Sequence, residues 1–490
     1  MTMTKYKKRA LTAVCALALA AGTAMASSVW TTRTLEAQYG DIKVTAAGQP
    51  LTLVDASGAP VEAFAVDGTV YLPIRAVGEA LGKEIIWDNS THTVHIGRSP
   101  FVEDASQLIE TVESVHPAFA QDAVPEGYEA AKAALLAQAE DPDCTMADFT
   151  WSAMACLAAL GDGHTRLDPF GGVAQPSLDV AWRAEGGGLF LTDEQGALTS
   201  TQVIAIGGVP VEAVFATVDR YVAAENQAGR DCNHTAWSAS PALLRKAGAA
   251  LDREGATVLD LLAGGVPATA EVGLRQPQAQ SAQRVISTQW MGDVFYVDFN
   301  QCVDTPEFQD AAAELRQAVQ DGGKVIVDIR GNGGGNSATC GQLLEAMGMS
   351  APSYGAYVRY SPLAQSFYPQ FYDQTSGLDY VPPNPSAAKQ NPKVQLVVLT
   401  DEETFSSANM LAVFVRDGGL GALIGRSPAN RPSHYGDILP FQLNHSGLFC
   451  TVSHKQWIRP NAADGSDTLA PDRLTAPGED SLQAALASFS

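Results

Sequence analysis

Two apolar segments, each followed by a turn and then a helix, constrain the fold of this chain most strongly. Lys324–Ile329 leads into the glycine-rich turn Arg330–Asn336. Val394–Thr400 leads into Thr404–Asn409 and an apolar helix predicted from Ala408. Unbroken apolar runs of this length are typical of buried strands, and strands that alternate with helices predict an α/β domain. We therefore expect the two turns to lie at matching strand ends.

Ser406 lies where the second strand gives way to its helix. A serine in this position has an exposed hydroxyl, and the positive end of the helix dipole favours developing negative charge beside it. The same residue type is a common helix N-cap, which is the more frequent explanation when the serine is considered alone. The glycine turn favours catalysis, because such a turn can present backbone N–H groups to an oxyanion. It matches neither of the glycine-rich nucleotide-binding motifs.

A third motif, Leu160–Thr165, has glycine on both sides of Asp162 and presents His164. Histidine is the usual general acid and base near neutral pH, although a single histidine beside a turn is more often only solvated or packed. His434 is closer to Ser406 in the sequence and is an alternative base.

Along the chain, the three motifs follow in the order Leu160–Thr165, the glycine-rich turn and Thr404–Asn409. This combination, with its order and spacing, resembles the tail-specific, or C-terminal processing, serine peptidases. The resemblance extends from about Phe101 to the C-terminus. It implies a crotonase-like or Clp-protease-like spiral of β-β-α units and proteolytic activity. It also implies that Ser406 is the nucleophile and that the N–H groups of Gly334 and Ser407 line the oxyanion hole.

The sequence departs from one branch of that family at Arg431. This residue occupies the position of the lysine in the Ser-Lys branch, and arginine cannot act as a base because it stays protonated. The chain therefore resembles the tricorn-like branch, whose histidine base corresponds to His164. In that branch a carboxylate near the C-terminus orients the histidine, and Asp464 is our candidate, with Asp467 and Asp472 as open alternatives. Arg431 could instead hold a substrate carboxylate.

Five segments are expected along the chain. Residues 1–26 have the basic start, apolar run and small-residue cleavage site of a signal peptide. Residues 27–98 resemble the copper amine oxidase N-terminal stalk domain, with alternating residues around Ile42 and a helix after Pro73. The others are a helical subdomain with the histidine motif (99–170), a PDZ-like or irregular β region (171–280) and the peptidase catalytic core (281–490).

Composition excludes several classes of function. The formal net charge of −23 repels nucleic acid and anionic lipid. The seven cysteines show no CxxC spacing, so the sequence suggests no zinc site, and it does not reveal any disulfide pairing. An acyl-CoA enzyme with the crotonase fold is disfavoured, because acyl-CoA is an intracellular substrate and the chain has an export signal.

The sequence thus predicts an exported serine endopeptidase, secreted or associated with the cell envelope, that cleaves extended or unstructured polypeptides. An acyl-enzyme would form on Ser406, with His164 as general base. No metal or organic cofactor is expected. The expected partners are polypeptide substrates, together with a cell-envelope component that the stalk would attach to. The alternative is an inactive relative that binds peptides or envelope partners.

Overall fold

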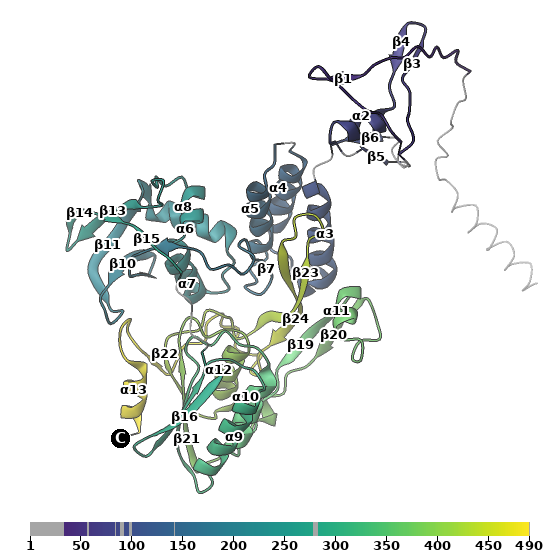
Figure 1. The fold of residues 1–490 in the computed structure, drawn as a ribbon. Helices are drawn as coiled ribbons and strands as arrows, with labels where there is room; N and C mark the ends of the chain where they lie inside the picture. Colours follow the sequence, from purple (N-terminus) through teal and green to yellow (C-terminus); the bar gives the residue numbers. More distant parts are fainter. Residues whose placement is uncertain are drawn as a thin grey trace, which may run out of the picture. The chain divides into compact units, whose positions relative to one another are not determined.

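The computed structural model describes residues 34–489, except 56–57, 84, 89–92, 98–99, 142 and 278–282. The chain divides into two compact units, Met1–Arg98 and Ser99–Ser490 (Figure 1). The predicted signal peptide, residues 1–26, lies outside the described residues. Among the helices of the described residues, none is both long and apolar enough to span a bilayer.

The described part of the first unit consists of short hairpins and a helix. Its elements are β1 (Thr45–Ala46), β2 (Gln49–Pro50), β3 (Phe64–Val66), β4 (Thr69–Tyr71), α2 (Ile74–Ala80), β5 (Ile85–Asp88) and β6 (Thr93–Ile96). Helix α2 begins after Pro73, as predicted. It packs so closely on β5 that a Cβ at Gly78 would lie 2.3 Å from Ile85 Cδ1. The strand predicted around Ile42 is wrong, because the first hairpin begins at Thr45.

The second unit begins with the predicted helical region. Its elements are α3 (Pro100–Val115), the 3-10 helix η1 (Pro117–Ala120), α4 (Tyr128–Glu140) and α5 (Met146–Ala158). Leu108, Val112, Leu135, Phe149 and Leu157 form its buried centre. The short strand β7 (Arg166–Leu167) follows the histidine motif and pairs with a strand near the C-terminus.

An antiparallel sheet with helices on it comes next. Its strands are β9 (Trp182–Glu185), β10 (Gly188–Thr192), β11 (Leu198–Ile206), β12 (Val209–Pro210), β13 (Thr257–Ala263) and β14 (Val266–Val272), and its helices are α6 (Val211–Tyr221), α7 (Gln227–Trp237) and α8 (Pro241–Lys246). The order across the sheet is β14-β13-β11-β10-β9, with β12 beside β11. Strands β8 (Ser177–Leu178) and β15 (Leu274–Arg275) pair separately. The likeness of this region to a PDZ module stays a prediction.

A largely parallel sheet forms the centre of the C-terminal region. Across it lie β16 (Ile286–Met291), β17 (Val294–Phe299), β18 (Gly323–Asp328), β21 (Val394–Thr400), β22 (Ala422–Gly425) and β25 (Arg473–Leu474). Only the edge pair β16–β17 is antiparallel among these. Asp328 lies opposite Leu399 in the β18–β21 register, so both turns leave the sheet at the same edge. The mixed α/β class is confirmed, and the spiral arrangement stays a prediction.

Helices cover both faces of this sheet (Figure 1). On one face lie α9 (Pro306–Ala318), α10 (Ser337–Ala346) and α12 (Ser407–Gly418), and on the other lies α13 (Ser481–Ser488). Phe308, Ala311, Ala312 and Leu315 are the buried side of α9, as their spacing predicts.

A second antiparallel sheet brings the histidine motif to the core. It consists of β20 (Gly377–Val381), β19 (Gly355–Tyr360), β24 (Phe449–Ile458) and β23 (His434–Gln442), with β7 on β24 and with α11 (Pro362–Phe367) and η2 (Pro385–Ala387) in the connections. Because β7 pairs with β24, the loop just before β7 is held against the C-terminal region.

Candidate active site

Ser406 has an unusual backbone conformation. It follows β21 and precedes the first residue of α12, with φ 52° and ψ −124°. Positive φ is rare and costly for a residue that has a Cβ, and such strain persists only where the surrounding structure enforces it. A strained strand-to-helix turn that exposes a serine hydroxyl is the arrangement of a hydrolase nucleophile. The side chain of Ser406 also makes no N-cap hydrogen bond, which argues against the purely structural explanation.

The glycine turn after β18 is hydrogen-bonded to the loop that contains Ser406. Thr404 Oγ1 donates to the Ile329 carbonyl at 3.0 Å. The Phe405 N–H donates to the Asn332 carbonyl at 3.0 Å. Ser407 Oγ donates to the Gly335 carbonyl at 2.7 Å. These three bonds fix the position of the glycine turn relative to the serine.

Gly334 packs directly on Ser406. A Cβ at Gly334 would lie 2.7 Å from Ser406 Cβ and 2.8 Å from the Ser407 nitrogen, so only glycine fits. The N–H of Gly334 donates to Asn332 Oδ1 at 2.8 Å. One of the two predicted oxyanion donors is therefore engaged in this structure. The other, Ser407, is the first residue of α12, where a backbone N–H has no partner within the helix.

His164 lies beside the loop that contains Ser406. Its residue is 8% exposed, and its ring packs on Phe405 with the centroids 4.6 Å apart. Its Nδ1 lies 3.7 Å from Asp162 Oδ1 and 3.7 Å from Glu225 Oε1. Among the described residues, neither ring nitrogen has a hydrogen-bond partner. His164 is thus close to the serine loop but is not hydrogen-bonded to Ser406.

Asp162 is a fully buried carboxylate with several donors. Its Oδ2 accepts hydrogen bonds from Thr165 Oγ1 at 2.5 Å and Ser453 Oγ at 2.7 Å. His116 Nε2 lies 3.2 Å from the same oxygen, and since His116 Nδ1 accepts a backbone N–H, Nε2 carries the proton. Burial alone would raise the pKa of Asp162, but His116 and His164 hold this pKa well below its ordinary value. Asp162 is therefore ionised at neutral pH.

Glu225 connects His164 to the backbone of Ser406. Its Oε1 accepts the Gly163 N–H at 3.2 Å, and its Oε2 accepts Asn430 Nδ2 at 2.7 Å. Asn430 Oδ1 in turn accepts the Ser406 N–H at 2.9 Å. Asn430 is fully buried, so it is a fixed bridge between the serine and the carboxylate beside the histidine.

The two carboxylates determine the charge of His164. Burial by itself lowers the pKa of this histidine, but Asp162 and Glu225 outweigh the effect of burial and raise the pKa to about 9. His434 behaves oppositely, because burial and the neighbouring His164 lower its pKa to about 4. The two rings are stacked with centroids 5.8 Å apart. At neutral pH, His164 is therefore an imidazolium and His434 a neutral imidazole.

Two of the three C-terminal acidic candidates, Asp464 and Asp472, form ion pairs with arginines and none with His164. Asp464 pairs with Arg459 at 2.8 Å instead, which corrects its assignment as the orienting carboxylate. Asp472 pairs with Arg416 at 3.2 Å. Only family position in the sequence favours Asp464 over Asp467 and Asp472, and family position does not specify which charges lie near these side chains in the fold.

Asp467 and Arg431 face each other at the rim of the site. Their charged groups are 4.0 Å apart and more than half exposed, at 61% and 51% respectively. Arg431 Nε also donates to the Glu225 carbonyl at 2.6 Å. This bond fixes the base of the guanidinium, while its outer end faces solvent. A substrate-binding role for Arg431 stays a prediction.

The cluster around His164 has the composition of a cation site. One ligand atom each from Asp162, His164 and Glu225 lie within 4.8 Å of one another, and all three residues are buried. However, each carboxylate oxygen already accepts at least one N–H or O–H hydrogen bond. These hydrogen bonds, together with the positive charge of protonated His164, stabilise the two carboxylates. We therefore assign no metal to the cluster.

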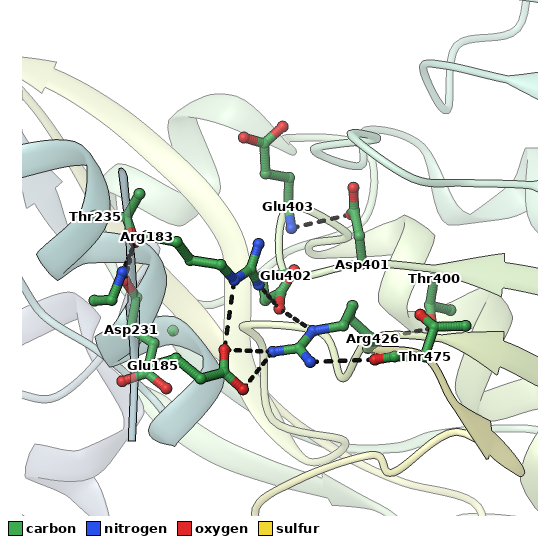
Figure 2. A network of polar contacts seen from close by, with 12 residues as sticks. Arg183, Glu185, Asp231, Thr235, Thr400, Asp401, Glu402, Glu403, Arg426 and Thr475 are labelled. Atoms are coloured by element: carbon green, nitrogen blue, oxygen red, sulfur yellow. Dashed lines mark hydrogen bonds and ion pairs between the residues drawn. The ribbon is translucent and has the colours of Figure 1, made fainter. Parts of the chain in front are cut away.

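An ion-pair network connects the loop that contains Ser406 to the neighbouring antiparallel sheet (Figure 2). Arg426, which follows β22, pairs with Glu402 at 2.7 Å and with Glu185 of β9 at 2.6 Å. Arg183, also on β9, pairs with Glu402. Glu402 lies four residues before Ser406, so the network limits the movement of the loop that contains Ser406.

A cavity of about 620 Å³ opens next to His164. Its lining includes Phe405 and Glu225 of the site, and apolar side chains such as Leu157, Tyr221 and Trp237. The volume exceeds that of one amino-acid side chain, and apolar walls with a few polar groups are typical of ligand pockets.

Three residues of this site were missed in the sequence. Asp162 lies inside the motif Leu160–Thr165, where the two flanking glycines predict only a turn that presents His164. Glu225 and Asn430 belong to segments with no recognisable pattern, and only tertiary structure brings them to His164 and Ser406.

Replacing Asn430 by alanine is expected to weaken both the fold and the site. The Ser406 N–H and Glu225 Oε2 each lose a buried partner, which costs roughly 2–4 kcal/mol of unfolding free energy for the two groups. We expect the rate of serine modification to fall at least 10-fold, an order-of-magnitude figure for a displaced catalytic group. Denaturant unfolding and the rate of reaction with a serine-directed probe measure the two effects.

Asn391→Ala is the matched control for that variant. Asn391 also bonds two backbone groups, Met347 and Lys393, but lies outside the site. It should lose stability without a change in the modification rate. Equal modification rates in the two variants would contradict the role given to Asn430.

Comparisons with known proteins show two family matches and several similar folds. Residues 293–473 match peptidase family S41, and residues 5–97 match the copper amine oxidase N-terminal domain. No curated protein matches the chain.

Among solved structures, mature CPAF matches at 13% identity with a TM-score of 0.52, over 80% of this chain and 96% of that chain. Mature CPAF complexed with lactacystin matches at 14% with a TM-score of 0.53, over 80% and 96%. The photosystem II D1 C-terminal processing protease matches at 15% with a TM-score of 0.40, over 77% and 93%.

The two CPAF structures show that the fold is shared, and the family match covers the segment that includes Gly334, Ser406 and Asn430. The chain is therefore a serine-type peptidase, with a domain of peptidase family S41 in residues 293–473 and an N-terminal domain of the copper amine oxidase type.

Proposed function

We propose that this chain is an exported endopeptidase that cleaves extended polypeptides through an acyl-enzyme on Ser406, with His164 as general base. The observation that supports this most is the Ser406 backbone, with φ 52° and ψ −124° at a strand-to-helix turn. A structural serine would gain nothing from this strain, whereas a nucleophile gains an exposed hydroxyl at a helix N-terminus.

In the proposed acylation, neutral His164 removes the proton from Ser406 Oγ as the oxygen attacks the peptide carbonyl. The imidazolium then gives this proton to the leaving amine, and an ester between Ser406 and the acyl part of the substrate remains. Water, deprotonated by the same histidine, hydrolyses the ester. Asp162 and Glu225 stabilise the imidazolium that forms in each step, since both lie 3.7 Å from Nδ1.

The oxyanion would be bound by the Ser407 N–H and, after a local change, by the Gly334 N–H. In the structure, Gly334 donates to Asn332 Oδ1. A substrate oxyanion carries a full charge and is a stronger acceptor than a neutral amide oxygen. We therefore expect the substrate to draw the Gly334 N–H away from Asn332. Each such donor is worth roughly 100- to 1,000-fold in rate.

Substrate segments would enter beside His164, where the cavity of about 620 Å³ can receive apolar side chains. The chain as a whole is acidic, with a formal net charge of −23. Export and envelope attachment are proposed from the signal-like residues 1–26 and from the stalk-type domain.

Hydrolysis of a reduced, unfolded protein tests this proposal. The purified chain is incubated with it at pH 9, where about half of His164 is neutral given its pKa of about 9, and the products are identified by mass spectrometry. Internal cleavage that is absent in the Ser406→Ala variant supports the proposal. An intact substrate after prolonged incubation with well-folded protein would contradict it.

A second candidate is a peptide-binding protein without turnover. Two observations favour it: the His164 ring nitrogens have no hydrogen-bond partner among the described residues, and the Gly334 N–H is engaged. Such a protein would bind the unfolded substrate in a pull-down equally well with Ser406 or alanine, and would leave it intact.

A further inference from the structure

Two buried cysteines lie in contact behind the glycine turn. Cys302 follows β17, and Cys340 lies in α10, which begins just after the turn. Both are fully buried, and their sulfur atoms are 3.8 Å apart. This is van der Waals contact, and a bond of about 2.05 Å would require each sulfur to move by roughly 1 Å.

Both cysteines are bonded to the segments that form the active site. The Cys302 N–H donates to the Gly334 carbonyl at 3.0 Å, and its carbonyl accepts the Asn336 N–H at 2.6 Å. The Cys340 thiol donates to the Ser407 carbonyl at 3.2 Å. The pair therefore links the C-terminal half of the glycine turn to the start of the helix that follows Ser406.

We propose that Cys302 and Cys340 form a reversible disulfide that slows the acylation of Ser406. The effect on acylation rests on the proposed function, whereas the disulfide itself does not. The oxidant is a low-molecular-weight disulfide. One cysteine thiolate attacks it and releases one small thiol, and the second cysteine then displaces the other. The protein loses two electrons and two protons, and the small disulfide becomes two thiols.

Oxidation changes the contacts that position the nucleophile. The S–H of Cys340 is lost, so the Ser407 carbonyl loses that donor. Movement of Cys302 towards α10 pulls on Gly334, which has no free space because a Cβ there would already lie 2.7 Å from Ser406 Cβ. A displacement near 1 Å at a catalytic group can cost about 100-fold in rate. We expect a smaller displacement here, and therefore a roughly 10-fold loss in the rate of acylation.

Burial makes the exchange slow in the folded protein. The hydrogen bond with Cys302 and burial both raise the pKa of Cys340 well above its ordinary value, so little thiolate is present. Thiolate is the attacking species, and the reaction therefore depends on local opening. Local opening recurs for as long as an oxidant is present, so we expect the disulfide to form over hours in any oxidising solution, and export would supply such an environment.

The experiment incubates the full chain with oxidised glutathione for hours and divides each sample. One part is denatured, alkylated and digested to search for a peptide pair linked through Cys302 and Cys340. The other part is reacted with a fluorophosphonate to measure the labelling rate of Ser406. We expect the linked pair, a loss of two hydrogen atoms in intact mass, labelling about 10-fold slower, and recovery of the rate with dithiothreitol.

Three variants complete the test. Cys302→Ser and Cys340→Ser should form no link, and the labelling rate of each should be the same with and without oxidant. Two variants are used so that poor folding of one does not decide the result. Cys144→Ser, distant in sequence and partly exposed, should behave as the parent. Alkylation of both cysteines after oxidation would overturn the proposal, as would a link that leaves labelling unchanged. A parent that forms the link but never labels would refute the proposed function and, with it, the effect on acylation, while the disulfide would stand.

Discussion

Replacing Ser406 by alanine is expected to reduce peptide hydrolysis by roughly 10,000-fold or more, as the loss of a nucleophile does in serine hydrolases. The reason is that the other hydroxyl in the turn between β21 and α12, that of Thr404, is buried and donates to the Ile329 carbonyl. The fold should persist, because the Ser406 side chain makes no N-cap hydrogen bond and its N–H still reaches Asn430. Hydrolysis of an unfolded protein, with circular dichroism as a check of folding, measures both effects.

Ser407→Ala is the matched control for this prediction. The Ser407 hydroxyl donates to the Gly335 carbonyl, and only its backbone N–H is assigned to the oxyanion. This variant should therefore lose no more than about 10-fold in rate, in line with the loss of one neutral hydrogen bond. Full activity of Ser406→Ala, or equal losses in both variants, would remove Ser406 from the role of nucleophile.

Raising the pH from 7 to 9 is expected to accelerate acylation of Ser406 about 50-fold. With a pKa of about 9, roughly 1% of His164 is neutral at pH 7 and half at pH 9, and only the neutral form removes a proton. The second-order rate constant for fluorophosphonate labelling reports the free enzyme and is measured from pH 6 to 10. His434 has a pKa of about 4, so a mechanism with this residue as base predicts a flat profile over that range.

Two variants separate these histidines. His164→Ala should label about 1,000-fold more slowly at pH 9, within the usual contribution of a general base, and should lose the rise with pH. His434→Ala should keep the rise. A rise that survives in His164→Ala and disappears in His434→Ala would reverse the assignment.

The same pKa shift affects stability. Because the folded-state pKa of His164 is raised from 6.5 to about 9, its contribution is fully present below about pH 6.5 and is lost as pH rises through 9. The shift corresponds to roughly 3 kcal/mol of unfolding free energy for this buried group. Denaturant unfolding at pH 6.5 and 9.5 should show a decrease of that order, and the decrease should vanish in His164→Ala.

Local patterns predicted the central elements well. Val394–Thr400 is a strand at the stated residues, because an unbroken apolar run between turn residues has few other stable arrangements. Ser406 could be found from the sequence, since the strand, the serine and the helix are consecutive. The positive φ of Ser406 could not, because it results from the surrounding packing.

The surroundings of His164 could not be predicted from local patterns. Glu225 lies 61 residues beyond it, in a segment whose role depends on how α7 packs on the core. Family position suggested Asp464, but the ion pair with Arg459 holds that side chain elsewhere. A loop residue's partner depends on which charges lie nearest in three dimensions, which the spacing of residues does not specify.

The central claim is that Ser406 is an activated nucleophile served by His164, and the most direct measurement is intact mass after incubation with a fluorophosphonate at pH 9. We expect one adduct per chain, mapped to the peptide that contains Ser406. We also expect no adduct in Ser406→Ala and slow labelling in His164→Ala. A well-folded parent that remains unmodified at pH 9, or an adduct that persists in Ser406→Ala, would contradict it.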